Sequence, residues 1–489
     1  MKTCFKTDIL IYLILFGTCI FILLQGSLVP YAKSVLGIDS SIFIYISKRI
    51  LEGQLLYKDL IDQKGPFLYV INVLALFIFN GKTIGIFIFE VISLFVASIM
   101  MYKTARFFTS KFISLLAVII SILSLVLLLI GGNFTEEWAL PYISIALYIF
   151  VADLKGHKSI NITRLFVLSL TFALTLMLRV NLVAIWAGFG IVLLIKWIKE
   201  KKFNEIIKYL SFILLFIFLS LLPFILYLFY TGTLSDAFYI VIVFNMFEYG
   251  PATENIFRSG FKILLGVTYY LNVIPVILVI YMFLREKTML NWGLMVAFAI
   301  TIVSCSIGGR YNHYFIIFTP LLVIPHAYIF TIIRDSFPKM KNICLLILFI
   351  FYSYSSTRTQ VKIILENFSE QGYSAHSLSP STMKKLKEVI IQNSQIDDKI
   401  LVNTLHAYIY LYSDRNCATR FLFPLKDSSL FEKNYVTEVS KALPELIIEF
   451  SNEYFGDALS LKALLNEKYH LIESIDDELY DVEVWKLNE

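Results

Sequence analysis

The segment Tyr57–Tyr69 has the sequence YKDLIDQKGPFLY, and it decides how the chain around it is threaded. Two lysines and two aspartates lie among its first eight residues, and an apolar run at about 66–80 follows them. The chain as a whole is unusually apolar, since 58% of its 489 residues are hydrophobic and only 16% are charged. Soluble globular proteins of this length do not have such a composition. The sequence therefore predicts a polytopic membrane protein.

Long apolar runs account for most of this composition. Each has roughly 16 to 24 residues, which at about 1.5 Å per residue is enough to cross a hydrocarbon core of about 30 Å as a helix. The first run follows a basic N-terminus and is too long for a typical signal-peptide core, so we expect it to be retained as a span. The candidate spans lie at about 8–29, 84–102, 112–130, 138–152, 163–178, 182–197, 206–229, 261–284, 289–307, 314–333 and 342–357.

The apolar run at 66–80 decides the topology. If it crossed the membrane, the basic loop 103–111 would lie outside and GGNFTEEW at 131–138 would lie inside, although cytoplasmic loops tend to carry Lys and Arg. If it does not cross, every basic loop lies on the cytoplasmic side. The charges therefore favour about eleven spans, with 66–80 lying along the outer surface or dipping into it. Its roughly 15 residues reach only about 22 Å, which agrees with this interpretation.

The C-terminal part changes in composition from about residue 358 onward. Charged residues become frequent, and no run is long enough to span a membrane. Its pattern predicts strands within 399–412, 445–451, 469–475 and 480–487 and helices at 380–393 and 460–469. We therefore expect an all-α transmembrane domain at 1–357 and a small α/β domain at 358–489, which faces outward together with a long first outer loop, 30–83.

One carboxylate stands at the start of a predicted surface helix in that loop. The apolar spacing of segment 37–54 predicts an amphipathic helix lying in the membrane interface, with Ser47 on its polar side. Asp39 begins this segment. Two interpretations are open, because an Asp at this position either caps the helix or acts as a functional group.

Other carboxylates fall on the same expected face. Glu136 and Glu137 stand at the outer start of a span, where solvation or capping is the alternative to a functional role. Asp59 and Asp62 belong to the first outer loop. Together with Asp39 these residues form an acidic set, which could supply a general base and hold a divalent cation such as Mg²⁺ or Mn²⁺.

Cationic and aromatic residues complement the acidic set. Lys64 follows in the first loop, Arg179 interrupts an apolar stretch, and Arg310 lies in GGRYNHYF. A guanidinium between two spans either reaches a lipid headgroup or meets a bound anion. The three cations are suited to a phosphate group, since Arg binds its oxygens bidentately and Lys supplies a point charge. His313 and Tyr314 line the same cavity or serve as an interfacial aromatic anchor.

Carboxylates and phosphate-binding cations at an outer membrane surface indicate a reaction on a phosphorylated lipid. Sugar transfer from a polyprenyl phosphate fits, because a carboxylate can deprotonate the acceptor hydroxyl while cations stabilise the departing phosphate. No nucleotide cofactor and no nucleic-acid partner is expected. A transporter or lipid flippase is the alternative, in which the charges line a pathway, although related halves are not evident in the sequence. A receptor or assembly protein would leave the outer carboxylates unexplained.

The motifs on this face resemble a known family. DSSIF at 39–43 and GQLLYKDLIDQKGPFLY at 53–69 resemble the first outer loop of the GT-C superfamily of integral-membrane glycosyltransferases. The likeness is greatest to the bacterial relatives of protein O-mannosyltransferases and of the lipid A aminoarabinose transferase, in which Tyr57 fits a G-x-x-x-Y-x-D pattern. It continues through NFTEEWALP, LRVN and GGRYNHYF, in order, over most of residues 1–330.

This resemblance implies roles for the site residues. Asp39 would be the catalytic base, Glu136 or Glu137 would assist it or bind metal, and Lys64 and Arg179 would contact the lipid phosphate. Many relatives carry Asp-Glu where this chain has Asp39 followed by Ser40, so metal dependence stays open, as does the choice among Glu136, Glu137 and Asp62 for the second acidic role.

The resemblance also implies an activity and a location. The chain would be a hexosyl- or pentosyltransferase, inverting at the sugar, that uses a polyprenyl-phosphate donor and a glycan, lipid or protein acceptor. It would be a multi-pass protein of the bacterial cytoplasmic membrane, with its active site and C-terminal domain outside the cell. Juxtamembrane helices in the first outer loop are also implied.

Overall fold

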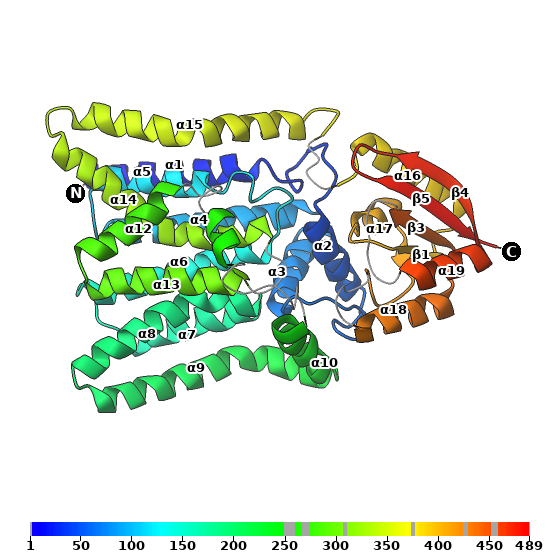
Figure 1. Ribbon diagram of the computed structural model, residues 1–489, viewed down its shortest axis with the longest axis horizontal. Helices are drawn as coiled ribbons and strands as arrows, with labels where there is room; N and C mark the ends of the chain where they lie inside the picture. Colours follow the sequence, from blue (N-terminus) through cyan, green and yellow to red (C-terminus); the bar gives the residue numbers. More distant parts are fainter. Residues whose placement is uncertain are drawn as a thin grey trace.

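The computed structural model describes residues 2–248, 260–266, 273–306, 311–372, 377–423, 429–450 and 458–488. Figure 1 shows a bundle of long helices that is joined at one end to a smaller unit of strands and helices. The N-terminus lies at the end of the bundle that is remote from this unit, and the C-terminus lies at the sheet (Figure 1).

The bundle helices correspond in order to the predicted spans. They are α1 (Lys2–Leu23), α4 (Ile84–Ala105), α5 (Lys111–Leu123), α6 (Thr135–Leu154), α7 (Ile162–Leu176), α8 (Ala184–Lys199), α9 (Phe203–Tyr230), α12 (Val273–Arg285), α13 (Met289–Ser306), α14 (Thr319–Ser336) and α15 (Lys341–Asn367). The short helices η1 (Val180–Val183), α10 (Leu234–Phe238), η2 (Tyr239–Glu248) and η3 (Asn312–Phe318) lie between them.

Six helical stretches among the described residues are long and apolar enough to cross a membrane. They are Ile84–Ala105, Thr135–Leu154, Val180–Lys199, Phe203–Tyr230, Met289–Ser306 and Asn312–Ser336. Shorter apolar helices accompany them, and part of the predicted span 261–284 lies outside the described residues. The predicted helical membrane fold is confirmed, while the number of eleven spans stays a prediction.

Two helices of segment 30–83 lie across the end of the bundle (Figure 1). They are α2 (Ile38–Leu51) and α3 (Pro66–Ile78), and Pro66 stands at the first position of α3, where a missing N–H costs nothing. The 13 residues of α3 span only about 20 Å, short of a membrane core. Its length and direction agree with a helix that does not cross.

The predicted polar side of α2 is wrong at Ser47. Ser40 to Ser47 are all buried, and Ser47 has no exposed surface. The reason is tertiary, because α2 packs between α3 and a helix of the C-terminal unit rather than lying with one side in water.

The C-terminal unit contains one mixed sheet. Its strands are β1 (Lys399–Val402), β2 (Asn416–Cys417), β3 (Leu446–Phe450), β4 (Tyr469–Asp476) and β5 (Asp481–Leu487), in the order β2-β1-β3-β5-β4. Strands β2, β1 and β3 are parallel, and β5 and β4 form an antiparallel hairpin on β3. The helices are α16 (Pro380–Asn393), α17 (Tyr408–Ser413), α18 (Ser429–Ala442) and α19 (Ala458–Lys468). The predicted α/β character is confirmed.

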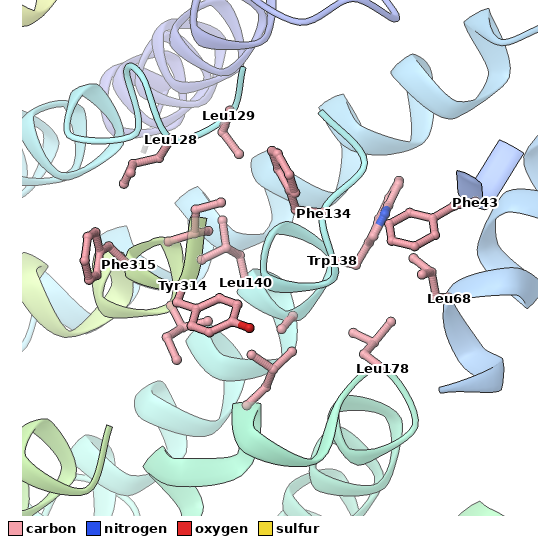
Figure 2. Packing of buried hydrophobic residues seen from close by; sticks show 14 of the residues in the cluster. Phe43, Leu68, Leu128, Leu129, Phe134, Trp138, Leu140, Leu178, Tyr314 and Phe315 are labelled. Atoms are coloured by element: carbon pink, nitrogen blue, oxygen red, sulfur yellow. The ribbon is translucent and has the colours of Figure 1, made fainter. Parts of the chain in front are cut away.

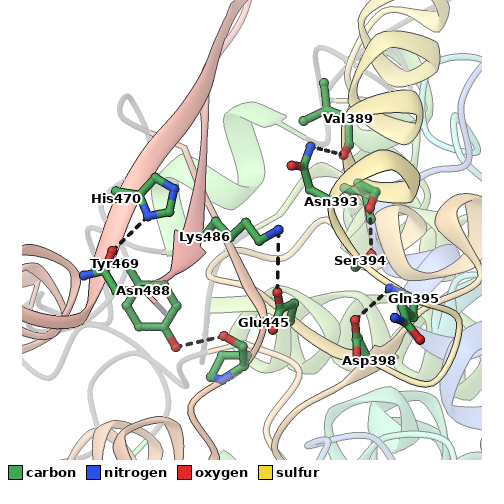
Figure 3. Close-up of polar contacts among 12 residues, drawn as sticks. Val389, Asn393, Ser394, Gln395, Asp398, Glu445, Tyr469, His470, Lys486 and Asn488 are labelled. Carbon is green, nitrogen blue, oxygen red and sulfur yellow. Dashed lines mark hydrogen bonds and ion pairs between the residues drawn. The ribbon is translucent and has the colours of Figure 1, made fainter.

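Polar contacts tie the strands of this unit to their neighbours (Figure 3). The Tyr469 hydroxyl donates to the Pro444 carbonyl over 2.9 Å, and Lys486 lies 3.9 Å from Glu445 just before β3.

One element of this unit differs from the prediction. Residues Tyr408 to Tyr412 are predicted in a strand, but they lie in helix α17. The buried Tyr408 and Tyr410 hydroxyls accept the backbone N–H groups of Leu378 and Val402, which favours the helix over its local β propensity.

Helix α15 connects the bundle to this unit. It continues to Asn367, past the predicted domain boundary at 357, and that boundary stays a prediction. Gln360 donates to the Phe21 and Ile22 carbonyls, and Asn367 donates to two carbonyls just after α1. These amides add hydrogen bonds to carbonyls in and just after the last turn of α1.

Candidate active site

A buried ion pair joins the first turn of α6 to the segment after α7, at the end of the bundle nearest the C-terminal unit. Arg179, which follows α7, donates through Nη1 to Glu136 Oε1 over 3.0 Å, and their side chains are 7% and 1% exposed. Arg179 also donates to the Tyr314 hydroxyl and lies over that ring, 4.5 Å from its centroid. The other Glu136 oxygen accepts the Thr135 hydroxyl over 2.8 Å. The guanidinium is therefore held by a carboxylate and an aromatic ring.

Further charged residues converge on this pair. Glu136 interacts electrostatically with Lys64 and His313 as well as with Arg179. His313 in turn interacts with Asp39. The ring of His313 stacks on Phe134, with 4.8 Å between centroids. We call the following set the polar cluster: Asp39, Asp62, Lys64, Glu136, Arg179 and His313.

A close glycine contact places Asp39 beside the loop that leads into α6 and Glu136. A Cβ at Gly37 would lie 2.6 Å from the Cα of Gly131, so only glycine allows this approach. Ser27 bridges the two segments, since its hydroxyl accepts the Gly37 N–H and donates to the Gly131 carbonyl. Asp39 lies in the first turn of α2 and is partly buried. No hydrogen bond among the described residues engages its carboxylate, which leaves it available to a substrate.

The turn that presents Lys64 is held by two buried side chains. Asp62 accepts the backbone N–H of Lys64 over 2.7 Å, and the Tyr57 hydroxyl donates to the Lys64 carbonyl over 2.7 Å. Burial raises the pKa of Asp62, and the opposing charge of Lys64 limits that rise. Tyr57 itself has a φ of 69°, which is unusual for a bulky residue. Asp62 and Tyr57 therefore orient the lysine.

Backbone pairing joins the Lys64 turn to the Arg179 loop. The Gly65 N–H donates to the Leu178 carbonyl over 3.0 Å, and the Phe67 N–H donates to the Met177 carbonyl over 3.1 Å. A Cβ at Gly65 would lie 2.0 Å from the Met177 oxygen, so glycine is required here. Figure 2 shows Phe43, Leu68, Trp138 and Leu178, which belong to the buried apolar core.

Some of the residues predicted for the site lie elsewhere. Asp59 is exposed, and its carboxylate accepts the Leu55 N–H. Glu137 is buried and interacts electrostatically with Glu90 of α4, away from the cations. Arg310 lies outside the described residues. The structure thus separates Glu137 from Glu136, although the two are adjacent in sequence.

The divalent cation predicted at Asp39 and Glu136 or Glu137 stays a prediction, because the described residues show no arranged metal site. Both Glu136 oxygens already accept hydrogen bonds, and Arg179 neutralises its charge. Among the described residues no group of three or more His, Cys, Asp or Glu side chains is arranged to hold a metal ion. A hard cation prefers about six oxygen ligands. No step of the reaction is therefore assigned to a metal.

Sequence reasoning missed a polar network behind the polar cluster. Glu90 Oε1 accepts the Asn133 N–H over 2.5 Å, and the Asn133 and Asn72 amides bond each other over 2.8 and 3.1 Å. Trp138 donates its indole N–H to the same Asn133 side chain over 2.9 Å. This network fixes the loop that leads into α6. One signal was present, because a lone carboxylate at Glu90 in the apolar run IGIFIFEVISLF marks a functional or structural site.

Comparison with known proteins bears on the fold. No family model and no curated protein matches the sequence. The solved structure of ArnT from Cupriavidus metallidurans bound to undecaprenyl phosphate matches with a TM-score of 0.66 and 11% identity, covering 97% of this chain and 98% of its own. The Archaeoglobus fulgidus oligosaccharyltransferase tethered with an acceptor peptide matches with a TM-score of 0.54 and 11% identity, covering 90% and 69%.

A further structure agrees with these two. It is the archaeal oligosaccharyltransferase AglB from Archaeoglobus fulgidus in complex with an inhibitory peptide and a dolichol-phosphate, with a TM-score of 0.52, 11% identity and coverage of 90% and 69%. The likeness to ArnT extends over nearly the whole length of both chains. The chain therefore has the fold of ArnT and of the Archaeoglobus fulgidus oligosaccharyltransferase, which agrees with the fold that the resemblance of its sequence motifs implies.

Proposed function

We propose that this protein is a membrane glycosyltransferase that moves a sugar from a polyprenyl-phosphate donor to an acceptor at the outer face of the bacterial cytoplasmic membrane. The observation that carries the proposal is the polar cluster, which gathers one available carboxylate and two cations at one end of the bundle. Neighbours of the same fold were solved with undecaprenyl phosphate and with dolichol-phosphate, which supports a lipid-linked donor.

Asp39 would act as the general base. Its carboxylate takes the proton of the acceptor hydroxyl, whose oxygen attacks the anomeric carbon of the donor sugar. The bond from that carbon to the phosphate oxygen breaks, and its electron pair leaves with the polyprenyl phosphate. Attack opposite the leaving group inverts the anomeric centre.

Lys64 would be the main contact of the departing phosphate. It is partly buried and makes no ion pair with a carboxylate of the described residues, so its charge is available to an anion. Arg179 would stabilise the charge that develops on the phosphate from its fixed position over Tyr314. Glu136 then acts through Arg179, because it holds the guanidinium in place.

Transport is the rival function. In a transporter the charged groups would line a pathway near the bilayer midplane. Here they gather where α2 and α3 meet the bundle, at the end that carries the C-terminal unit (Figure 1). This placement favours chemistry at a membrane surface.

Asp39→Asn tests the base. Surface glycans, lipids and proteins of a deletion strain are compared with those of the parent by mass spectrometry, which defines the missing product. Asp39→Asn should fail to restore that product while its amount in the membrane stays normal. Ser40→Ala, at the next position, is the matched control and should restore it, because the Ser40 hydroxyl has no hydrogen-bond partner in the described structure. Restoration by Asp39→Asn would refute the base assignment.

A second experiment tests the proposed sidedness. Lys103 is exposed in the last turn of α4, beside the basic loop that joins α4 to α5. In a variant without natural cysteines, Lys103→Cys should react with a membrane-impermeant maleimide only after the cells are permeabilised. Labelling of intact cells would place this loop outside and overturn the topology.

A further inference from the structure

A cavity lies where segment 30–83 meets the C-terminal unit. Its volume is about 500 Å³, which is within the range of small-ligand sites. Residues of α2 and of the loop 54–60 line one side, and residues at 416–420 with the end of α18 line the other. We call this cavity the junction pocket. It is separate from the polar cluster, and nothing in the proposed transfer of the sugar uses it.

The junction pocket carries an excess of positive charge. Five of its lining residues are cations, namely Arg49, Lys58, Lys399, Arg420 and Lys441, whereas only Asp59 and Glu438 are acidic. Glu438 pairs with Arg420 at 2.7 Å. The three lysines make no ion pair among the described residues and remain exposed. Arg49 also pairs with Glu52, so the excess of positive charge that would attract an anion comes from the three lysines.

The pocket is built by contacts between the two units. The Cys417 N–H donates to the Tyr45 hydroxyl over 2.8 Å, and Arg49 donates to the Asn416 side chain over 2.8 Å. The Ile61 N–H donates to the Arg420 carbonyl over 3.0 Å. These bonds fix both walls of the pocket, and they hold the Arg49 side chain in place before any ligand arrives.

The position of the junction pocket relates it to the acceptor. Arg49 follows Asp39 by ten residues on the same helix, which places it roughly 15 Å along α2. That separation places the Arg49 side of the pocket away from the carboxylate that is proposed to act as the base. The pocket wall also offers Gln54, Asn416 and Thr419, whose amide and hydroxyl groups suit a polyol.

We propose that the junction pocket binds a phosphate or carboxylate group of an anionic glycan acceptor, several sugar units away from the hydroxyl that reacts at Asp39. This inference rests on the proposed function, since it names the acceptor class of the same enzyme. The C-terminal unit then contributes directly to substrate selection, because Lys399, Arg420 and Lys441 all belong to it.

Charge reversal tests the proposal. The probes are dextran sulfate, neutral dextran and poly-glutamate, and their binding to the purified full-length protein is measured in detergent. The wild type should bind dextran sulfate in a salt-sensitive manner and should not bind neutral dextran. Lys399→Glu/Lys441→Glu should weaken this binding by at least about tenfold. The matched control Lys384→Glu/Lys387→Glu makes the same change in net charge on exposed positions of α16 outside the pocket and should bind normally.

Binding of undecaprenyl phosphate separates this inference from the proposed function. The pocket variant should keep its affinity for undecaprenyl phosphate, whereas Lys64→Ala should lose that affinity and keep dextran sulfate binding. The pocket assignment would be overturned if dextran sulfate binding fell equally in the pocket and control variants. It would also be overturned if the wild type did not bind dextran sulfate. Tighter binding of poly-glutamate than of dextran sulfate would overturn the glycan in favour of an acidic peptide. If every variant, Lys64→Ala included, keeps its affinity for undecaprenyl phosphate, the proposed donor site is wrong and the pocket assignment is unaffected.

Discussion

Gly65→Ala is expected to slow sugar transfer strongly, although the substitution changes no charged residue. A Cβ at Gly65 would lie 2.0 Å from the Met177 oxygen and 2.5 Å from its carbonyl carbon, whereas real Cβ contacts are essentially never under 3.0 Å. The obstacle is backbone, so no side-chain rotation can relieve it. The Lys64 turn must therefore move by about 1 Å from the loop that carries Arg179.

The size of the effect follows from that displacement. A misplacement of about 1 Å costs on the order of 100-fold in rate when it affects the positioning of reacting groups. The strain also lowers stability by about 1–3 kcal/mol, which a folded protein of this size tolerates. Transfer should thus fall by about 100-fold while the purified variant remains folded.

The assay is restoration of the missing surface product in the deletion strain, together with binding of undecaprenyl phosphate to the purified protein. Gly190→Ala in α8 is the matched control, because a Cβ there meets nothing within 4 Å and alanine favours a helix. A transfer rate for Gly65→Ala within about threefold of the parent's rate would refute the argument that the backbone contact at Gly65 sets the spacing between Lys64 and Arg179.

Arg179→Ala should destabilise the protein by about 3–5 kcal/mol, because Glu136 stays buried without its counter-charge; an unchanged melting temperature in detergent would contradict this. Lys64→Ala should leave melting unchanged and weaken undecaprenyl phosphate binding by about tenfold, and equal affinity would exclude Lys64 from the phosphate site. Burial raises the pKa of Glu449 in β3 from its ordinary 4.5 to about 7, so the folded state holds this proton more tightly than the unfolded state. Stability should therefore be lost as the pH rises from about 4.5 through about 7, by at most about 3 kcal/mol. In melting curves recorded across this pH range, the Glu449→Gln variant should lose less stability than the wild type. An equal loss in the two proteins would assign the pH dependence to another group.

Local patterns in the sequence account for much of this structure. Apolar runs identified the bundle helices in order, and Pro66 marked the start of α3. Hydrophobic length and helical or strand periodicity are local properties, so they can be read without knowing the fold. The residue types that suit phosphate chemistry could also be picked out at Asp39, Lys64 and Arg179, although their roles stay predictions.

The tertiary structure decided which of these residues meet. Sequence could not separate Glu136, which pairs with Arg179, from its neighbour Glu137, which faces Glu90. Adjacent positions on a helix point about 100° apart, so which one faces a partner depends on how the helix is rotated in the bundle. Periodicity also assigned Ser47 to a solvated side, because the pattern cannot reveal that the C-terminal unit covers α2.

Glycine contacts between distant segments gave the site its geometry. Gly37 meets Gly131, and Gly65 meets Met177, across separations of roughly a hundred residues. A glycine in the sequence shows that the backbone can approach another surface there, but it does not say which one. The sequence thus determined the helices, the membrane and the chemical groups, whereas only the packing of distant backbones determined the polar cluster and the junction pocket.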